Sequence, residues 1–364
     1  MIGQPVHRLP KFLVNLLFIV CLAQVLLAAN SKAFAKETFV PISYLEIPNW
    51  AAEDHSAAFS VFSKHCQRLL ELPDKGFHIV CKKALEMDQA ETKSFRDFFE
   101  RHFQAYKISK NGFITGYYQP EVDASLHQTD QYNIPLYRFP KGVKNLPDRQ
   151  AVMEGALSNK GLELVWLKDP VEAFFIAIQG SALLRMQDKS LYSLRYAGKS
   201  GHPYTPIGRI LIEKGDISRD KMSMQAIKSW LNAHPEQIDD ILTQNKSYIF
   251  FDLIKIERKN SAPIGGAGLP LKAGYSLAVD LNFHGYGTPI FLSGSNVPVT
   301  QQSAPFARLL IAQDTGSAII GAARGDLYVG TGKSAGALAG QLQHRVQFFS
   351  LLPKANEIAL ERKQ

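Results

Sequence analysis

Two aspartates near the C-terminus stand where acid or base chemistry is expected. Asp314 follows an apolar run and precedes Gly316, and Asp326 lies twelve positions further on, directly after Gly325. Glycines let other backbone or a substrate approach closely, and a carboxyl group in apolar surroundings can hold a proton near neutral pH. The spacing and setting of the two acids therefore predict an acid/base site, without yet fixing the reaction.

An aspartic protease is one reaction that this pattern could serve. Asp-Thr-Gly-Ser at 314–317 is the active-site sequence of that class, which needs two carboxylates that share a proton. This chain has a single copy of the sequence, and the dimeric proteases that use one copy per chain are short domains. The sequence therefore argues against a protease.

Nucleotide and metal sites are also disfavoured. Gly332-Lys333-Ser334 resembles the end of a phosphate-binding loop, but Leu327 stands where that loop needs its first glycine. No His-Glu-x-x-His or Cys-x-x-Cys pattern and no closely spaced histidine cluster occurs. We expect neither a metal nor a cofactor.

Carbohydrate cleavage fits the remaining features best, because it uses carboxyl groups to cut and aromatic rings to hold sugars. Tyrosines stand beside glycines in two upstream segments, 115–120 and 196–204, and a tyrosine offers a flat ring with a hydroxyl group. A tyrosine in a β-strand is more often part of the core, so each segment alone is a weak signal. The substrate-binding candidates are Thr115, Tyr117, Tyr118, Gln179, Tyr196 and Gly198.

The elements that must position these residues change along the chain. Apolar residues recur every three to four positions over 52–109, which predicts helices. Short β-rich runs separated by Pro and Gly follow, interrupted by one predicted helix at 223–231, and favour a β-barrel or sandwich. The predicted strands are 113–118, 163–167, 174–178, 248–251, 275–279, 289–292, 308–312 and 326–329.

Taken together, residues 112–346 resemble the MltA family of membrane-bound lytic transglycosylases, exported bacterial enzymes that cut peptidoglycan. Residues 115–120 are similar to its Thr-Gly-Tyr-Tyr-x-Pro strand. The segment that begins at Tyr196 is similar to its Tyr-Ala-Gly motif. Asp280, Asp314 and Asp326 correspond to the aspartates of its C-terminal three-aspartate (3D) domain. Ser317 and Ala182 stand where glycine is usual and Ser200 where asparagine is common, which affects substrate positioning more than activity.

The resemblance implies a mainly β fold of two domains. A double-psi β-barrel catalytic domain would comprise 36–118, with N-terminal helices, and 250–350. A smaller β-domain, 119–249, would be inserted into it, and the glycan strand of peptidoglycan would lie in the groove between the two. The roughly 330 residues that remain after the predicted signal peptide also suggest two domains.

The same resemblance assigns the residues' roles. Asp326 would be the catalytic residue, acting first as acid and then as base, while Asp314 would be a supporting acid and Asp280 a structural one. The implied activity is a lytic exotransglycosylase that cleaves the bond between N-acetylmuramic acid and N-acetylglucosamine and leaves a 1,6-anhydro product. The alternative is a barrel that binds peptidoglycan or another polysaccharide without cutting it.

The N-terminus and the cysteines indicate the compartment. Arg8 and Lys11 precede the apolar run 12–29, and Ala33-Phe34-Ala35 suits a signal peptidase, so 1–35 is a predicted signal peptide and the periplasm the predicted location. Cys21 lacks the preceding small residue of a lipid-attachment site, which leaves open whether the protein is free or held at the outer membrane. Cys66 and Cys81 remain as a pair, which favours a disulfide over two buried thiols.

The charge balance stays basic after removal of the signal peptide, falling from +8 to +5 because Arg8, Lys11 and Lys32 leave and no acid does. A basic surface suits an anionic polymer, but the lysines are scattered and indicate solvated surface. Nucleic acid is not an expected partner of an exported chain.

Overall fold

The computed structural model describes residues 39–71, 76–87, 93–258, 261–295, 297–298, 305–355 and 357. The predicted signal peptide, including Cys21, lies outside these residues. Within them, no helix has both the length and the apolar character needed to cross a membrane.

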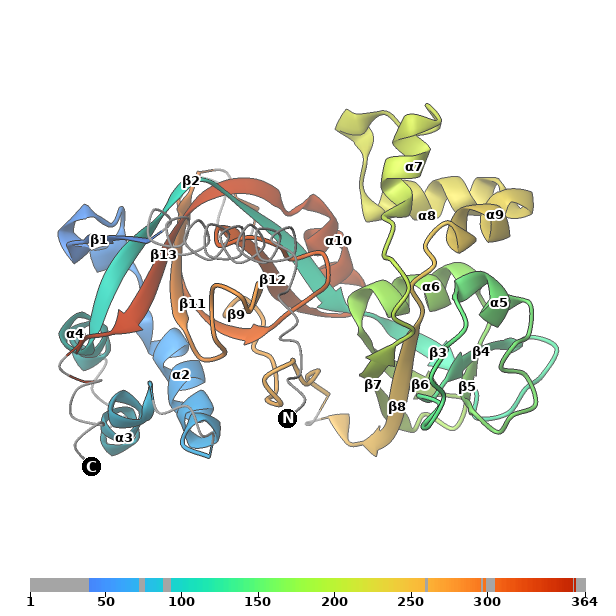
Figure 1. Ribbon diagram of the computed structural model, residues 1–364, viewed down its shortest axis with the longest axis horizontal. Helices are drawn as coiled ribbons and strands as arrows, with labels where there is room; N and C mark the ends of the chain where they lie inside the picture. The colour runs from blue at the N-terminus through green and yellow to red at the C-terminus, as the bar shows by residue number, and fades with distance from the viewer. Residues whose placement is uncertain are drawn as a thin grey trace, which may run out of the picture.

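The largest sheet closes on itself as a barrel of six strands (Figure 1). The strand order is β2-β12-β9-β11-β10-β13, and β13 pairs back with β2, so that the six strands form a ring. The β2–β12 and β9–β11 pairs are parallel and the others antiparallel. The strands are β2 (Phe103–Gln119), β9 (Ser276–Val279), β10 (Pro289–Gly294), β11 (Phe306–Asp314), β12 (Arg324–Thr331) and β13 (Gln343–Pro353), and β1 (Phe39–Ile42) adds to β2.

Both faces of several barrel strands are buried, which explains their nearly continuous apolar sequences. Ile290 and Leu292 of β10 belong to one buried cluster with residues of the other barrel strands. Phe291, between them, belongs to a second cluster with the N-terminal helices. Side chains alternate across a strand, so a run of apolar residues supplies both clusters at once.

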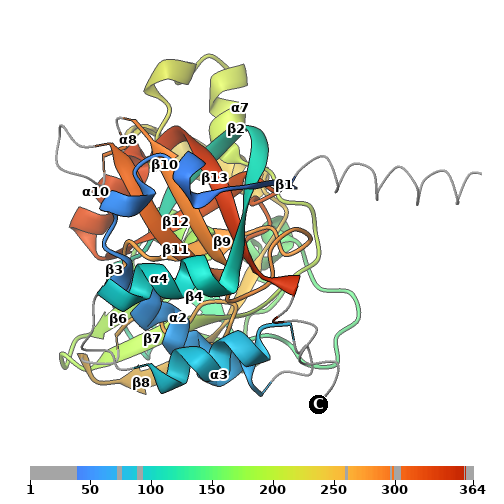
Figure 2. The ribbon, with the colours of Figure 1, turned by 90° about the vertical axis from the view of Figure 1, so that its left-hand side faces the viewer.

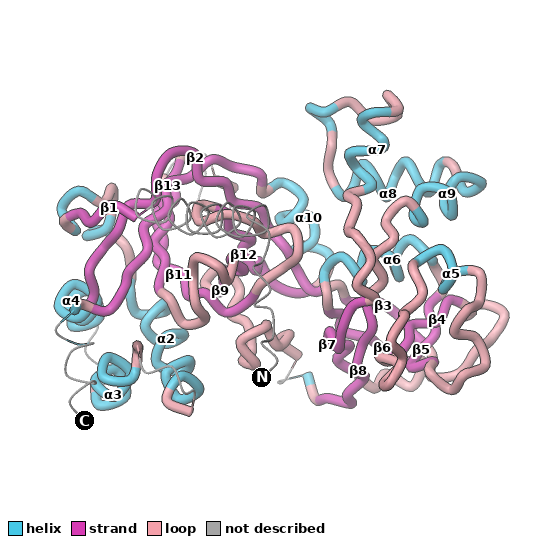
Figure 3. The backbone as a smooth tube through the Cα atoms, viewed as in Figure 1, coloured by secondary structure: helices cyan, strands magenta, loops and turns pink. Residues whose placement is uncertain are grey.

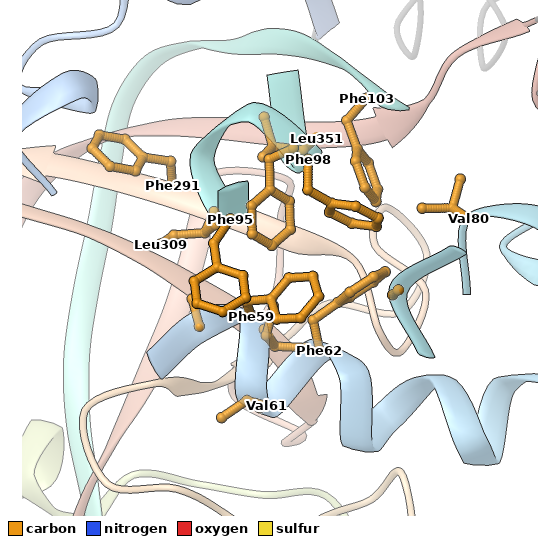
Figure 4. Close-up of a cluster of buried hydrophobic side chains, with 14 of the residues drawn as sticks. Phe59, Val61, Phe62, Val80, Phe95, Phe98, Phe103, Phe291, Leu309 and Leu351 are labelled. Atoms are coloured by element: carbon orange, nitrogen blue, oxygen red, sulfur yellow. The ribbon is translucent and has the colours of Figure 1, made fainter. Parts of the chain in front are cut away.

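Three N-terminal helices cover one end of the barrel, α2 (His55–Leu69), α3 (His78–Glu86) and α4 (Lys93–His102) (Figure 2). Their phenylalanines interleave with those of the strands, and the rings of Phe59 and Phe95 stack 4.5 Å apart (Figure 4). A disulfide between Cys66 and Cys81 joins α2 to α3. The predicted helical region is confirmed as far as α4, but β2 begins at Phe103, within the range expected to be helical.

A central region, which we define as residues 121–256, lies beside the barrel and mixes strands with helices (Figures 1 and 3). One sheet has the order β3-β6-β7-β8, and β4 pairs with β5. The strands are β3 (Glu121–Ala124), β4 (Ile134–Tyr137), β5 (Glu163–Leu167), β6 (Ser181–Met186), β7 (Leu191–Lys199) and β8 (Ile249–Ile256). The helices are α5 (Arg149–Met153), α6 (Pro170–Gln179), α7 (Ile207–Glu213), α8 (Met224–Ala233) and α9 (Ile238–Thr243).

Two expectations about this region are wrong. Residues 174–178 lie in α6 and not in a strand: the side chain of Asp169 caps the helix, Pro170 occupies its first turn, and Gly180 ends it in the left-handed conformation. These capping signals outweigh an apolar run that is compatible with either structure. The single predicted helix, 223–231, is accompanied by four others.

The end of the central region also differs from the expected boundary at residue 249. β8 pairs with β7 from Ile249 to Ile256, so these residues belong to the sheet of the central region. A division that follows the sheets falls after Ile256.

One helix, α10 (Lys333–Gln341), packs on β2 and β12 and lies between the barrel and the central region (Figure 1). A Cβ added at Gly336 would stand 2.8 Å from the ring of Tyr118, and one at Gly340 only 2.0 Å from Oε1 of Gln225 in α8. Glycine at 336 therefore allows α10 to pack closely on the buried ring of Tyr118, whereas at 340 the flexible end of Gln225 can move aside.

Candidate active site

The parallel pairing of β2 with β12 brings the predicted site residues together. Asp326 lies opposite Thr115, and Tyr328 lies opposite Tyr117. Because alternate residues of a strand share a face, the side chains of Asp326 and Tyr328 meet those of Thr115 and Tyr117 on one side of the sheet. The site is thus built from segments about 200 residues apart in the sequence.

A chain of hydrogen bonds fixes the orientation of Asp326. Thr115 Oγ1 donates to Asp326 Oδ1 at 2.5 Å, and Arg324 Nη2 donates to Thr115 Oγ1 at 2.7 Å. Since Arg324 can only donate, Thr115 must accept from it and directs its single proton at Asp326. Oδ1 of Asp326 is therefore held as an acceptor, and a proton on this carboxyl group is favoured at Oδ2.

Burial raises the pKa of Asp326 to about 6, against the lowering effect of the Thr115 hydrogen bond and of the Arg324 charge. The nearby carboxylate of Asp314 raises it further. The residue itself is only partly buried, so it keeps some access to solvent. A carboxyl group with these properties can donate a proton in mildly acidic conditions and take one back afterwards.

Asp314 sits in a cradle of three donors. The hydroxyl of Tyr117 donates to Oδ2 at 2.8 Å, and the backbone N–H groups of Gly266 and Thr315 donate to Oδ1 at 2.8 and 2.9 Å. A Cβ at Gly266 would lie 2.3 Å from the hydroxyl oxygen of Tyr286, so glycine lets this N–H approach Asp314 without displacing the tyrosine. Burial nevertheless raises the pKa of Asp314 above its ordinary value.

Tyr117 connects the two acids electrostatically. Burial, and then the carboxylate of Asp314, raise the pKa of Tyr117 well above its ordinary value, with a smaller contribution from Asp326. The phenol therefore keeps its proton and remains a donor to Asp314. Its ring also lies 5.5 Å from that of Tyr328.

Asp280 organises a neighbouring loop. Its Oδ1 accepts from the backbone and side chain of Asn282, and its Oδ2 accepts from the N–H of Gly321 at 2.8 Å. Burial tends to raise the pKa of Asp280, but these hydrogen bonds prevail and hold it below its ordinary value. A charged, fully engaged carboxylate of this kind suits the structural role expected of it.

Two substrate-binding candidates point away from the aspartates. Tyr118 is 7 % exposed and packs against α10, because it occupies the opposite face of β2 from Tyr117. The side-chain oxygen of Gln179 accepts from the backbone N–H of Tyr118 at 3.0 Å, which ties α6 to β2. These contacts give both residues structural roles, and direct contact of either with the substrate stays a prediction.

Tyr196 and Gly198 belong to β7 of the central region. Tyr196 is 54 % exposed, whereas Gly198 lies against the ring of Phe139, which a Cβ would meet at 2.4 Å. The pairing of β7 with β8 shifts register between the two residues. The next residue, Lys199, donates from Nζ to Ser317 Oγ at 3.4 Å, so this end of β7 reaches the loop after Asp314.

Sequence reasoning missed Arg324 and a polar group beside Tyr328. The hydroxyls of Tyr328 and Thr331 are 3.0 Å apart, and Thr331 donates to the buried Gln119 at 3.0 Å. Arg324 and Tyr328 lie two residues before and after Asp326, and this spacing already places them on its face of the strand. The strand period was thus a signal that could have identified them.

Two cavities in the described part of the chain lie elsewhere. One is in the central region, and the other lies between Tyr118, Pro120 and Lys333, where the barrel meets that region. None of the three aspartates lines either cavity. Within the described ranges, no group of three or more His, Cys, Asp or Glu side chains could hold a metal ion.

Comparison with known proteins matches both parts of the chain. Residues 113–252 match the MltA specific insert domain, and 275–352 match the 3D domain. Membrane-bound lytic murein transglycosylase A of Vibrio cholerae is 38 % identical over 64 % of this chain and 63 % of its own length. The Escherichia coli protein of the same name is 33 % identical over 74 % of each chain.

Solved structures show the same likeness. A membrane-bound lytic murein transglycosylase from Agrobacterium tumefaciens is 33 % identical, with a TM-score of 0.80 over 90 % of this chain and 100 % of that one. Escherichia coli MltA, solved with bound chitohexaose, is 26 % identical with a TM-score of 0.70 over 87 % and 94 %. Sequence and fold agree over most of both chains, and the chain therefore belongs to the MltA family of membrane-bound lytic murein transglycosylases.

Proposed function

We propose that this protein is a lytic transglycosylase that cleaves the β-1,4 bond between N-acetylmuramic acid and N-acetylglucosamine in peptidoglycan, with Asp326 as its single acid and base. The observation that carries the proposal is the carboxyl group of Asp326, whose pKa is raised to about 6 and whose Oδ1 is engaged by Thr115. The names of the relatives support the reaction class.

In the first step, protonated Asp326 gives its proton to the oxygen that links the two sugars. The bond from C1 of the muramic sugar to that oxygen breaks, and the leaving sugar departs with the proton as a free hydroxyl group. Positive charge develops on the muramic ring while Asp326 becomes a carboxylate. Thr115 and Arg324 stabilise this negative charge, because one donates to it and the other supplies a nearby positive charge.

In the second step, the hydroxyl oxygen on C6 of the muramic sugar attacks C1 and closes a 1,6-anhydro ring. Its proton passes to the carboxylate of Asp326, which returns the enzyme to its starting state. Water is not consumed, so no second carboxylate is needed to activate it, in contrast to hydrolytic glycosidases. Asp314, held by three donors, supports the site by raising the proton affinity of Asp326.

We propose that the barrel has a double-psi topology and that the central region is a domain inserted into it. The glycan strand would lie between the two. The exposed ring of Tyr196 offers a surface for a sugar, and Lys199 reaches Ser317 beside the aspartates. A relative, Escherichia coli MltA, was solved with a bound chitin oligosaccharide, which supports a site for such a polymer.

A periplasmic location with association to the outer membrane is proposed with this function. The pattern of 1–35 supports export, and the relatives are named membrane-bound. Immunodetection of the protein in separated periplasmic and outer-membrane fractions tests this location.

Digestion of purified peptidoglycan by residues 36–364, followed by mass spectrometry of the released muropeptides, tests the reaction. Products ending in 1,6-anhydro-N-acetylmuramic acid, lighter by one water than hydrolysis products, are expected. Reducing muramic ends would replace the proposal by a hydrolase. Retained binding without products would replace it by a polysaccharide-binding protein.

A further inference from the structure

The central region buries an arginine that has no acidic partner. Arg149, the first residue of α5, is 4 % exposed. Among the described residues, no Asp or Glu lies within ion-pair distance of its guanidinium group. A buried charge without a counter-charge is costly, so its presence calls for a physical reason.

Neutral groups hold the guanidinium group of Arg149 in place. Nε donates to the carbonyl of Asn245 at 2.9 Å, and Nη2 donates to that of Ser247 at 2.7 Å. The rings of Phe174 and Tyr248 lie 4.6 and 5.5 Å from its central carbon. Nη1 has no hydrogen-bond partner in the described part of the chain, which leaves donors of the fork available.

Arg149 is one of the residues that line a cavity of about 630 Å3. Its lining combines apolar side chains, among them Leu136, Trp166 and Phe174, with a similar share of polar surface. Gln128 and Asn133 of the lining are exposed and mark its opening to solvent. A volume of several hundred Å3 and a wall that combines apolar side chains with a few fixed polar groups are typical of small-ligand sites.

The charges around the cavity indicate the kind of ligand. Arg149 is the sole cation in its lining, which also contains two acids, Glu163 and Asp239. Its planar fork matches a carboxylate, whereas the acids attract an ammonium group and repel a multiply charged phosphate. The complementary ligand therefore carries one carboxylate and one amino group.

We propose that this cavity binds the free carboxylate end of an amino acid or short peptide, with Arg149 as the anchor and Glu163 and Asp239 facing the amino group. The site is distinct from the aspartate site, because its lining runs from Gln128 to Phe251 and includes none of Asp280, Asp314 and Asp326. If the proposed function holds, the stem peptides of peptidoglycan supply such ends, and the central region can hold the polymer while the barrel cuts it.

Isothermal titration calorimetry of the full mature chain with the dipeptide D-alanyl-D-alanine tests the anchor. The C-terminal amide of the dipeptide is the matched probe, since it lacks the carboxylate charge. We expect saturable binding of the dipeptide and at least about tenfold weaker binding of the amide, as for a lost charged hydrogen bond. Arg149→Gln should weaken the dipeptide by a similar factor and leave the amide unchanged. Equal affinities for the two probes, or no saturable binding of the dipeptide, would overturn the proposal.

A second variant keeps the test independent of the fold around Arg149. The double substitution Glu163→Gln and Asp239→Asn preserves shape at two residues of which one is exposed and the other partly so. The wild type should prefer the dipeptide over its N-acetyl derivative, and the double variant should lose that preference. An unchanged preference would show that Glu163 and Asp239 do not contact the amino group. Tighter binding of inorganic phosphate than of the dipeptide would contradict the proposed class of ligand.

The proposed function can fail separately from this inference. Asp326→Asn should bind the dipeptide as the wild type does, because the two sites share no residue. Loss of dipeptide binding in a folded Asp326→Asn protein would contradict the separation of the sites.

Discussion

The barrel and the central region each bury charged groups, and they resolve the cost of burial in different ways. In the barrel, Asp326 responds to burial by a pKa raised to about 6, so it can hold a proton. In the central region, burial lowers the pKa of Arg149 only to about 10, so it stays charged at neutral pH. A carboxyl group can change its protonation state within the physiological range, and an arginine cannot.

This difference separates the chemistry that each region can perform. A group that gains and loses a proton near neutral pH can act as an acid and a base, so the barrel suits bond cleavage. A permanent charge held by carbonyl groups and aromatic rings suits the binding of an anion. The comparison is therefore tested by substitutions that remove one charge at a time.

The largest effect is expected from Asp326→Asn. The amide keeps the shape of the carboxyl group but cannot donate an acidic proton, so cleavage should fall by about 10²–10⁴-fold while glycan binding persists. Release of anhydro-muropeptides and binding to insoluble peptidoglycan measure the two effects. Near wild-type cleavage by a folded Asp326→Asn protein would exclude Asp326 as the single acid. Asp314→Asn is the comparison variant, in which the second aspartate of the site loses its charge.

Removing the charged group should change the free energy of unfolding in opposite directions in the two regions. The folded pKa of Asp326 lies above its ordinary value of 3.8, so its charge opposes folding above about pH 6 and not below pH 3.8. Asp326→Asn should therefore raise the free energy of unfolding at pH 7 by about 1–2 kcal/mol, discounted for partial exposure, and change it little at pH 4.

Arg149→Ala should instead lower the free energy of unfolding by about 2–4 kcal/mol, because the carbonyls of Asn245 and Ser247 lose their donors. Urea unfolding at pH 4 and pH 7 measures these effects for both variants. A gain in stability from Arg149→Ala, or a loss from Asp326→Asn at pH 7, would reverse the comparison.

Arg324→Gln should change the pH dependence of cleavage. The positive charge of Arg324 lowers the pKa of Asp326, so its removal should raise that pKa. The wild-type kcat/KM should decline as pH rises through about 6, since the protonated acid is lost, and the variant's decline should begin at higher pH. Profiles of kcat/KM from pH 4 to 8 measure this shift. If the decline began at the same pH in the variant and the wild type, a group other than Asp326 would control it.

The smallest effect is expected from Tyr117→Phe, with Tyr118→Phe as its matched control on the opposite face of the same strand. Tyr117→Phe removes the hydroxyl that donates to Asp314 and should lower kcat/KM by a few-fold, about 1 kcal/mol. Tyr118→Phe should leave it unchanged, because that ring packs against α10. An equal loss of kcat/KM in both variants would indicate that Tyr118 also contributes to the substrate site.

Much of the site was accessible to sequence reasoning. The glycines and β-forming residues around Asp314 and Asp326 predicted strands at or next to the two acids, and the motif at 115–120 predicted another strand of the same fold. Arg324 was missed although its two-residue spacing from Asp326 places it on the same face. The helix α6 was missed because an apolar run fits a strand or a helix, and its capping residues were the deciding signal.

The pairing of strands distant in sequence was beyond local patterns. Nothing in the sequence alone states that Thr115 lies opposite Asp326, that Tyr117 donates to Asp314, or that Tyr118 turns to α10. A one-residue change of register would exchange the two tyrosines between faces, so the register decides which of them serves the site.

The sequence by itself determined the family, the acids and the types of most elements, because motifs, spacing and local periodicity are properties of adjacent residues. Only the tertiary structure decided the raised pKa of Asp326, the donor chain from Arg324 through Thr115, and the cavity beside Arg149. Burial and hydrogen bonding depend on which distant segments pack together, and that packing sets the energy of each charge.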